Sequence, residues 1–358
     1  MRVNAIVIPL IRSELCDLKT WLRYCPKSGK SSKKVYLSID QTWHEADKKD
    51  ILDTYSRCSL HEEGWTLEFV ECQMTAEESF YLKRSKVSID IVKHPYGQKS
   101  GPNMQFFRTI RVLKQSRVEI NAVLLMEVDA FPVASGWLTV LNDSLKDIPS
   151  NLLISGPRYA GRSFLKDEIK DHFNGNSVYF IGCGDFYRFL DCWEELLLQS
   201  MKIEPFMAYD VVIPWYMNHR ITHKGVFVLT SENTEFAAEC YRSRSFDLTQ
   251  FLINYGGPDE NHNDYKLDVP AFLQEFPSAL IVHGKCFMED IHTLRLSQKF
   301  TARRHPANIL VDAIMAGDYE GSLLLGINNY ALMKIITKKV ERLTSRQALL
   351  IQREWTNE

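Results

Sequence analysis

Two acidic residues that follow a short apolar run have the types and spacing best suited to chemistry in this chain. Residues 122–126 are all apolar, and Glu127 and Asp129 come directly after them, separated by one residue. So short an apolar run predicts a strand buried on both faces, as at the centre of a parallel sheet. Alternate side chains of an extended chain point the same way, so both carboxylates can reach one cation. Mg²⁺ and Mn²⁺ prefer such oxygen ligands and share them with substrate phosphates.

The alternative is that these two residues are simply solvated side chains at a strand end. The surrounding elements help to choose between this alternative and a cation site. Strand and helix patterns alternate upstream, and Asp40 ends the second strand in the way that the acidic pair ends the central one. Repeated strand–helix units predict an α/β protein with a parallel sheet and right-handed crossovers. We expect strands at residues 5–11, 34–40 and 65–71, and helices at residues 15–24, 45–57 and 103–115.

Composition excludes several classes of protein. The chain has 43 basic and 45 acidic residues, so no strongly basic field points to a nucleic-acid partner. Its eight cysteines contain no CxxC pair, which indicates reduced thiols in a cytoplasmic protein. No apolar run approaches the length of a membrane span, and the first residues are typical of a strand rather than a signal peptide. We therefore expect a soluble or at most peripheral protein.

Three further motifs lie in the second half. Asn174, Gly175 and Asn176 form a tight-turn signal before an apolar strand. Asp210 lies in an apolar, helix-like stretch, where a carboxylate must be paired, exposed or functional. His283 ends a short apolar strand, and neutral imidazole binds divalent metals, while Lys285 could neutralise a diphosphate. A simple turn, a helix cap and an ordinary strand-end histidine are the respective alternatives.

The remaining patterns concern the second half of the chain and its end. Helices are predicted at residues 136–145 and 185–199, and a strand at 151–156. Residues 230–270 are rich in polar and turn residues, which predicts a long irregular segment that could close over substrate. Residues 306–315 and 322–343 have the pattern of amphipathic helices. These could pack on the main domain, form an oligomer contact or lie on an anionic membrane surface.

The order of these elements, together with the acidic x-Asp motif, resembles the GT-A fold of nucleotide-sugar-dependent glycosyltransferases over about residues 4 to 290. The resemblance implies a Rossmann-like, mostly parallel central sheet flanked by helices. It implies a glycosyltransferase domain at residues 1–303, with a nucleotide-binding half at about 1–135 and an acceptor half at 136–303. Residues 304–358 would then be a C-terminal helical extension.

The resemblance also implies roles for individual residues. Glu127-Val128-Asp129 stands where that family carries its Asp-x-Asp motif, although its first residue is glutamate instead of aspartate. Asp129 is the more dependable metal ligand, with Glu127 and His283 completing a site for Mn²⁺ or Mg²⁺. Asp210 is the candidate general base if the reaction inverts configuration. Nucleotide and donor contacts are expected from Pro9, Leu10, Ile11, Arg12, Asp40, Arg108, Val128 and Lys285, and acceptor or sugar contacts from His172, Asn174, Gly175, Asn176 and Tyr209.

The function that this resemblance implies is metal-dependent transfer of a sugar from a UDP- or GDP-linked donor to a glycan or glycoconjugate acceptor. A sugar nucleotidyltransferase is an alternative, but such enzymes carry a glycine-rich loop after the first strand, and residues 9–14 contain no glycine. A carbohydrate- or protein-binding module on a degenerate transferase scaffold is the other alternative. The acidic motif and the late His-Gly-Lys motif argue against it.

Overall fold

The computed structural model describes most of a unit that runs from Met1 to Ala302. The described residues are 2–29, 33–41, 43–81, 94–115, 119–146, 148–160, 172–222, 231–255 and 275–283. The predicted C-terminal helices and Lys285 lie outside them.

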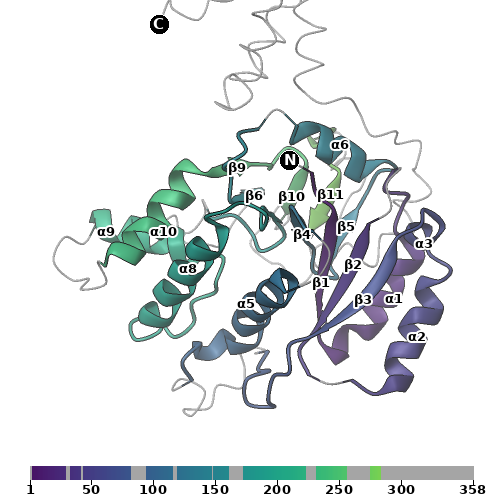
Figure 1. Cartoon of the computed structure of the whole chain (residues 1–358), viewed down its shortest axis with the longest axis horizontal. Coiled ribbons are helices and arrows are strands. Elements are labelled where there is room, and N and C mark those ends of the chain that lie inside the picture. Colours follow the sequence, from purple (N-terminus) through teal and green to yellow (C-terminus); the bar gives the residue numbers. More distant parts are fainter. Residues whose placement is uncertain are drawn as a thin grey trace, which may run out of the picture. The chain divides into compact units, whose positions relative to one another are not determined.

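A seven-stranded sheet forms the centre of the described structure (Figure 1). Its strands are β1 (Ala5–Leu10), β2 (Lys34–Ile39), β3 (Thr66–Glu71), β4 (Val123–Leu125), β6 (Ile154–Gly156), β8 (Val178–Tyr179) and β9 (Ser245–Asp247). They lie in the order β3-β2-β1-β4-β8-β6-β9. Only β8 runs antiparallel to its neighbours among the described pairs of this sheet. The expected α/β class with a mostly parallel sheet is therefore confirmed.

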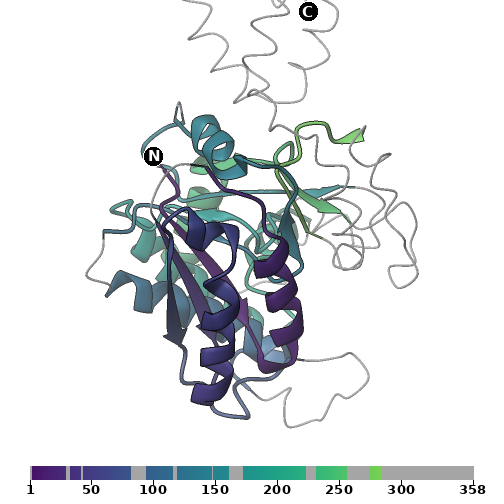
Figure 2. The same cartoon turned by 90° about the vertical axis from the view of Figure 1, so that its right-hand side faces the viewer.

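Helices cover both faces of this sheet, because alternate residues of its central strand face opposite ways. In β1, Ile6 and Ile8 pack in one apolar core, whereas Ala5 and Val7 pack in another. The first core includes residues of α1 (Leu15–Tyr24), α2 (Glu45–Tyr55), α3 (Ser59–Glu62) and α6 (Trp137–Ser144). The second includes residues of α5 (Ser100–Lys114), α8 (Phe186–Ser200), α9 (Val212–Thr222) and α10 (Glu232–Ser243). Figure 2 views the side on which α1 and α2 lie.

Local sequence explains why these helices dock as they do. In α1, Leu18, Trp21 and Leu22 recur at the spacing of one helical face, and all three are fully buried. The indole Nε1 of Trp21 donates a hydrogen bond to the Ala130 carbonyl at 2.8 Å. The same contact therefore fixes α1 and the backbone beside Asp129.

A second, four-stranded sheet was not predicted from the sequence. It consists of β5 (Ala130–Pro132), β11 (Ile281–His283), β10 (Leu252–Tyr255) and β7 (Tyr159–Ala160), in that order. Strand β11 is antiparallel to β5 and parallel to β10. The predicted irregular segment at 230–270 is wrong for its described part, which forms α10, β9 and β10. Buried residues such as Ala237 and Leu252 supply the apolar positions that its polar composition hid.

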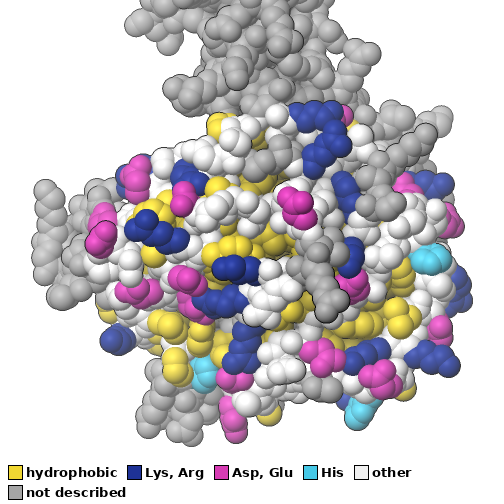
Figure 3. All heavy atoms as spheres, in the orientation of Figure 1, with side chains coloured by type: hydrophobic (Ala, Val, Ile, Leu, Met, Phe, Trp, Pro, Cys, Tyr) yellow, Lys and Arg dark blue, Asp and Glu magenta, His cyan; other side chains and the backbone are white. Residues whose placement is uncertain are grey.

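Cysteines, helix apolarity and surface charge can also be described for these residues. None of its seven cysteines forms a disulfide. No helix in the described ranges combines the length and apolarity that crossing a bilayer requires. On the described part of the face in Figure 3, acidic and basic side chains are interspersed.

Candidate active site

The acidic pair lies where the chain passes from the central sheet to the second sheet. Strand β4 ends at Leu125, and the amide of Met126 still bonds the Val7 carbonyl at 2.8 Å. The amide of Ala130 then bonds the Glu127 carbonyl at 2.9 Å, and β5 begins. Glu127 and Asp129 therefore lie in a turn rather than in the extended strand that we expected. The site is at the carboxyl end of the central strands, where open α/β sheets bind ligands.

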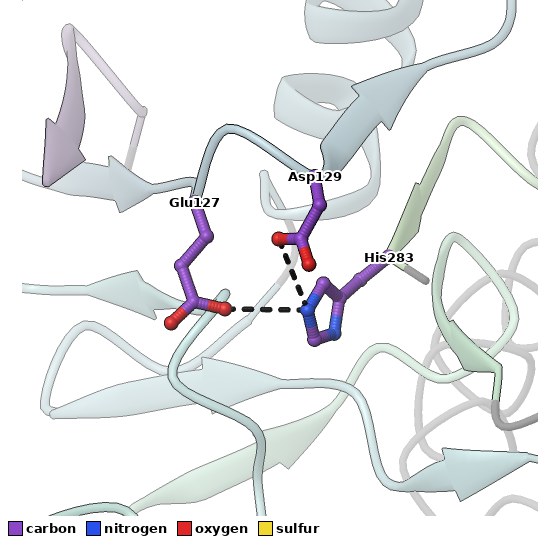
Figure 4. A group of neighbouring side chains, drawn as sticks. All are labelled: Glu127, Asp129 and His283. Carbon is purple, nitrogen blue, oxygen red and sulfur yellow. Dashed lines mark ion pairs between the residues drawn. The ribbon is translucent and has the colours of Figure 1, made fainter. Parts of the chain in front are cut away.

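His283 completes a cluster with these two carboxylates (Figure 4). It is the last residue of β11, and the antiparallel register pairs it with Ala130, the residue after Asp129. Its Nε2 lies 3.2 Å from Glu127 Oε2 and 3.3 Å from Asp129 Oδ1. The structure thus brings together the three residues that were predicted as metal ligands.

The spacing of these atoms suits a small divalent cation. One ligand atom from each side chain lies within 4.8 Å of the others. Bonds of about 2.1 Å to an octahedral cation separate neighbouring ligand atoms by about 3.0 Å. The two distances from His283, 3.2 and 3.3 Å, are close to that separation. Carboxylates and neutral imidazole are both groups that bind divalent metal ions.

The two carboxylates favour the protonated form of His283. Burial by itself would lower the pKa of His283, but Asp129 and Glu127 outweigh this effect, and the pKa lies well above its usual value. The His283 side chain is 19% exposed, against 29% for Asp129 and 43% for Glu127. The cluster is therefore open on the Glu127 side.

Two asparagines contact the cluster. Asn176 Oδ1 accepts a hydrogen bond from the Glu127 amide at 2.6 Å, and its Nδ2 donates to Glu127 Oε2 at 3.0 Å. Asn254 Oδ1 lies 2.9 Å from His283 Nδ1. Asn254 escaped the sequence analysis because it lies in the segment that was expected to be irregular. Its strand, β10, is only four residues long, so its pattern gave little signal.

Asp210 lies beside the turn that precedes β8. Its Oδ2 accepts a hydrogen bond from the Gly175 amide at 3.1 Å and lies 3.9 Å from His172 Nε2. Asn174 Oδ1 accepts from the Asn176 amide at 2.9 Å, which closes the turn. Most of the residues that were predicted to contact the acceptor substrate or the sugar therefore lie around Asp210. Asn176 connects them to Glu127 through its hydrogen bonds.

Several residues that were predicted to contact the nucleotide instead contact other parts of the protein. Asp40 is 6% exposed, and its carboxylate accepts hydrogen bonds from Ser79 and from Trp43. Arg108 is paired with Glu78, its Nη2 lying 2.9 Å from Oε1. Val128 is buried in the core that contains α1.

The end of β1 also bears residues that were predicted to contact the nucleotide. Pro9 and Leu10 are the last two residues of β1. Ile11 follows them, and Arg12 reaches the Asp47 carboxylate at 3.0 Å.

Glu14 is an acidic residue near the site that the sequence analysis missed. Its pKa is raised to about 7, mainly by burial and in smaller part by the negative charges of Glu127 and Asp129, while a hydrogen bond from Ile11 acts in the opposite direction. That bond joins the Ile11 amide to Glu14 Oε2 at 3.1 Å. Three carboxyl groups therefore influence one another at the carboxyl ends of β1 and β4.

Comparisons with known proteins place the chain beside several solved glycosyltransferases. No protein-family model matches it, and no curated protein matches its sequence. The galactosyltransferase LgtC, solved with donor and acceptor sugar analogues, is 10% identical with a TM-score of 0.44, over 83% of this chain and 97% of that one. Mouse xyloside xylosyltransferase 1 is 10% identical with a TM-score of 0.43, over 80% and 98%. The glycosyltransferase GlyE of Streptococcus pneumoniae is 12% identical with a TM-score of 0.39, over 82% and 61%. By name, all three are glycosyltransferases.

Proposed function

We propose that this chain is a glycosyltransferase that moves a sugar from a nucleotide-diphosphate donor to a hydroxyl group of a glycan or glycoconjugate. The observation that carries the proposal is the convergence of Asp129, Glu127 and His283 at the carboxyl end of the central strands. A diphosphate leaving group gains negative charge as the glycosidic bond breaks. Mn²⁺ or Mg²⁺ held by these residues would supply a Lewis acid for that charge.

The other residues of the site would bind and orient the two substrates. Strand β1 lies between β2 and β4. Pro9 and Leu10 at its end, with Ile11 and Arg12 after it, would hold the nucleoside of a UDP- or GDP-linked donor, together with Asp40 directly after β2. Arg108 and Lys285 would add positive charge for the diphosphate, and Val128 would hold the backbone between the two acidic ligands. Arg108 must leave Glu78 to do so, because the two are ion-paired in the structure.

Asp210 would position or deprotonate the acceptor hydroxyl. Its carboxylate is fixed by the Gly175 amide, and the side chain is 16% exposed, so it retains access to solvent. His172, Asn174, Asn176 and Tyr209 would shape the same part of the site. If the reaction inverts the anomeric centre, Asp210 accepts the proton. The division at residue 303, a cytoplasmic location and a membrane or oligomer contact through the C-terminal helices belong to the proposal too.

The experiment that tests the proposal is calorimetric binding of UDP, GDP, CDP and dTDP, each with and without Mn²⁺. We expect one nucleotide to bind tightly to the wild type with the metal and to lose binding in Asp129→Ala. Asp191→Ala is a matched control, because Asp191 is an exposed carboxylate of α8 that pairs with Arg111 of α5. If no nucleotide binds under any condition, the transferase proposal fails. Nucleotide binding that does not depend on the metal would show that Asp129, Glu127 and His283 are not ligands of a cation that holds the donor.

A further inference from the structure

Two buried side-chain amides contact the metal-binding cluster from outside it. Asn176 is 2% exposed and Asn254 is 5% exposed, so both are as buried as core residues. They come from different parts of the fold, one from the turn before β8 and the other from β10. A buried amide is costly unless it is hydrogen-bonded, so its partners indicate why it is there.

Asn176 fixes the conformation of Glu127 at two points. Its oxygen accepts from the Glu127 backbone amide at 2.6 Å, and its nitrogen donates to Glu127 Oε2 at 3.0 Å. The same nitrogen donates to Asn174 Oδ1 at 2.6 Å, so both of its hydrogens are used. Only a side chain with one acceptor and two donors can make these three bonds. Aspartate lacks the donors and leucine lacks both kinds of group.

Asn254 fixes the orientation of His283. The parallel register of β10 and β11 places the two residues side by side, and the amide oxygen lies 2.9 Å from Nδ1. An amide oxygen only accepts hydrogen bonds, so Nδ1 carries a hydrogen whether or not Nε2 is also protonated. Nε2 is then the nitrogen turned toward Glu127 and Asp129, as Figure 4 shows. A metal-binding histidine is commonly held in this way by a partner on its second nitrogen.

We propose that Asn176 and Asn254 are positioning residues that orient Glu127 and His283 and thereby set the affinity of the site for its divalent cation. This inference rests on the proposed function, because it assumes that the cluster holds a metal. Both partners are neutral amides, so the three ligands contribute only the two negative charges that a divalent cation balances. A carboxylate in place of Asn254 would keep the acceptor and add a third negative charge, which binds the cation more tightly.

The test is the dissociation constant of Mn²⁺ alone, measured from the electron paramagnetic resonance of the free ion. We expect Asn176→Leu and Asn254→Leu to weaken Mn²⁺ binding by about 10- to 100-fold. We expect Asn254→Asp to bind Mn²⁺ at least as tightly as the wild type. Asn142→Leu is the matched control, because the two bonds of the buried Asn142 amide within the described residues both go to the Val3 backbone, at 2.7 and 3.3 Å. It should lower the unfolding temperature and leave Mn²⁺ binding unchanged.

The outcomes separate this inference from the proposed function. A wild type that binds no Mn²⁺ overturns both. A wild type that binds Mn²⁺, with both leucine variants within twofold of it, overturns the roles of Asn176 and Asn254 alone. Equal affinities for Asn254→Asp and Asn254→Leu would also overturn the role of Asn254. If Asn176→Leu does not fold, the two substitutions of Asn254 still decide the inference for His283.

Discussion

Replacing Gly175 with alanine tests whether the turn that joins Asp210 to the cluster of Glu127, Asp129 and His283 is as tightly packed as it is in the structure. A Cβ atom at Gly175 would lie 2.2 Å from Tyr209 Oη and 3.2 Å from Tyr209 Cζ. Gly175 is not among the described glycines with a positive φ, so alanine is compatible with its backbone conformation. The whole effect of the substitution must then come from this collision.

Tyr209 is unable to move away from the new methyl group. Its ring stacks on Phe106 with 4.0 Å between the ring centroids and an interplanar angle of 11°. Its backbone amide bonds Asn103 Oδ1 at 2.8 Å, and its carbonyl accepts from the Trp193 indole at 2.7 Å. The turn must therefore shift, and the Gly175 amide moves away from Asp210.

Two contributions determine the expected loss of stability. Overpacking a rigid site costs about 1–3 kcal/mol. Loss of the hydrogen bond between the Gly175 amide and the Asp210 carboxylate costs about 1.5–3 kcal/mol. Because the shift relieves part of the overpacking, we expect Gly175→Ala to lower the free energy of unfolding by about 2–4 kcal/mol in urea denaturation. Gly184→Ala is the matched control, since a Cβ there meets no atom within 4 Å.

A double-mutant cycle identifies the collision itself. Tyr209→Phe removes the oxygen that the new methyl group meets and leaves the ring carbon at 3.2 Å. We expect Gly175→Ala to cost about 1–2 kcal/mol less in the Tyr209→Phe background. The reasoning is refuted if Gly175→Ala costs no more than Gly184→Ala, or if Tyr209→Phe leaves its cost unchanged.

Three further substitutions test other parts of the site. Because the pKa of Glu14 is raised from 4.5 to about 7, the folded chain binds its proton more tightly than the unfolded chain does. In the presence of a chelator, the free energy of unfolding should then fall as the pH rises from 5 to 7, and it should fall less in Glu14→Gln than in the wild type. Equal slopes of this free energy against pH in the two proteins, measured by urea denaturation, would contradict this expectation. Trp21→Phe leaves the buried Ala130 carbonyl without its donor and should cost about 1–3 kcal/mol in urea denaturation, whereas a change below 0.5 kcal/mol would contradict the bond. Gln105→Leu leaves the Leu10 carbonyl of β1 and the Ser38 carbonyl of β2 without the amide that bonds them at 3.3 and 2.7 Å, and should lower the unfolding temperature by about 2–8 °C in calorimetry. An unchanged temperature would mean that other donors replace the amide.

The first half of the fold could be predicted from the sequence because its elements have regular patterns. Apolar residues recur at the spacing of a helical face in α1, and the structure has this helix at Leu15–Tyr24, as predicted. The strands at Ala5–Leu10 and Lys34–Ile39 end within one residue of the prediction. Each of these elements buries a whole face or side, so the pattern of apolar residues along the sequence marks it.

The rest of the site could not be predicted, because it depends on contacts between distant residues. Short strands such as β5, with three residues, have no period long enough to recognise. The turn from Glu127 to Ala130 follows from the pairing of β5 with β11, which no local pattern shows. Asn254 contacts His283 only because β10 and β11 are neighbours in the sheet. The sequence predicted the three ligands by residue type, and only the tertiary structure revealed what holds them.

The position of β11 has a consequence for the folding of this protein during its synthesis on the ribosome. In the second sheet β11 lies between β5 and β10, yet it is the last of the four strands to be synthesised. A nascent chain that ends before Ile281 therefore contains β5 and β10 but lacks the strand that pairs with both of them. His283 is added to the chain only when nearly all of the Met1–Ala302 unit has been translated. The cluster of Glu127, Asp129 and His283 is thus complete only late in biosynthesis, and the cation binding that we propose for it is expected to be absent from shorter chains.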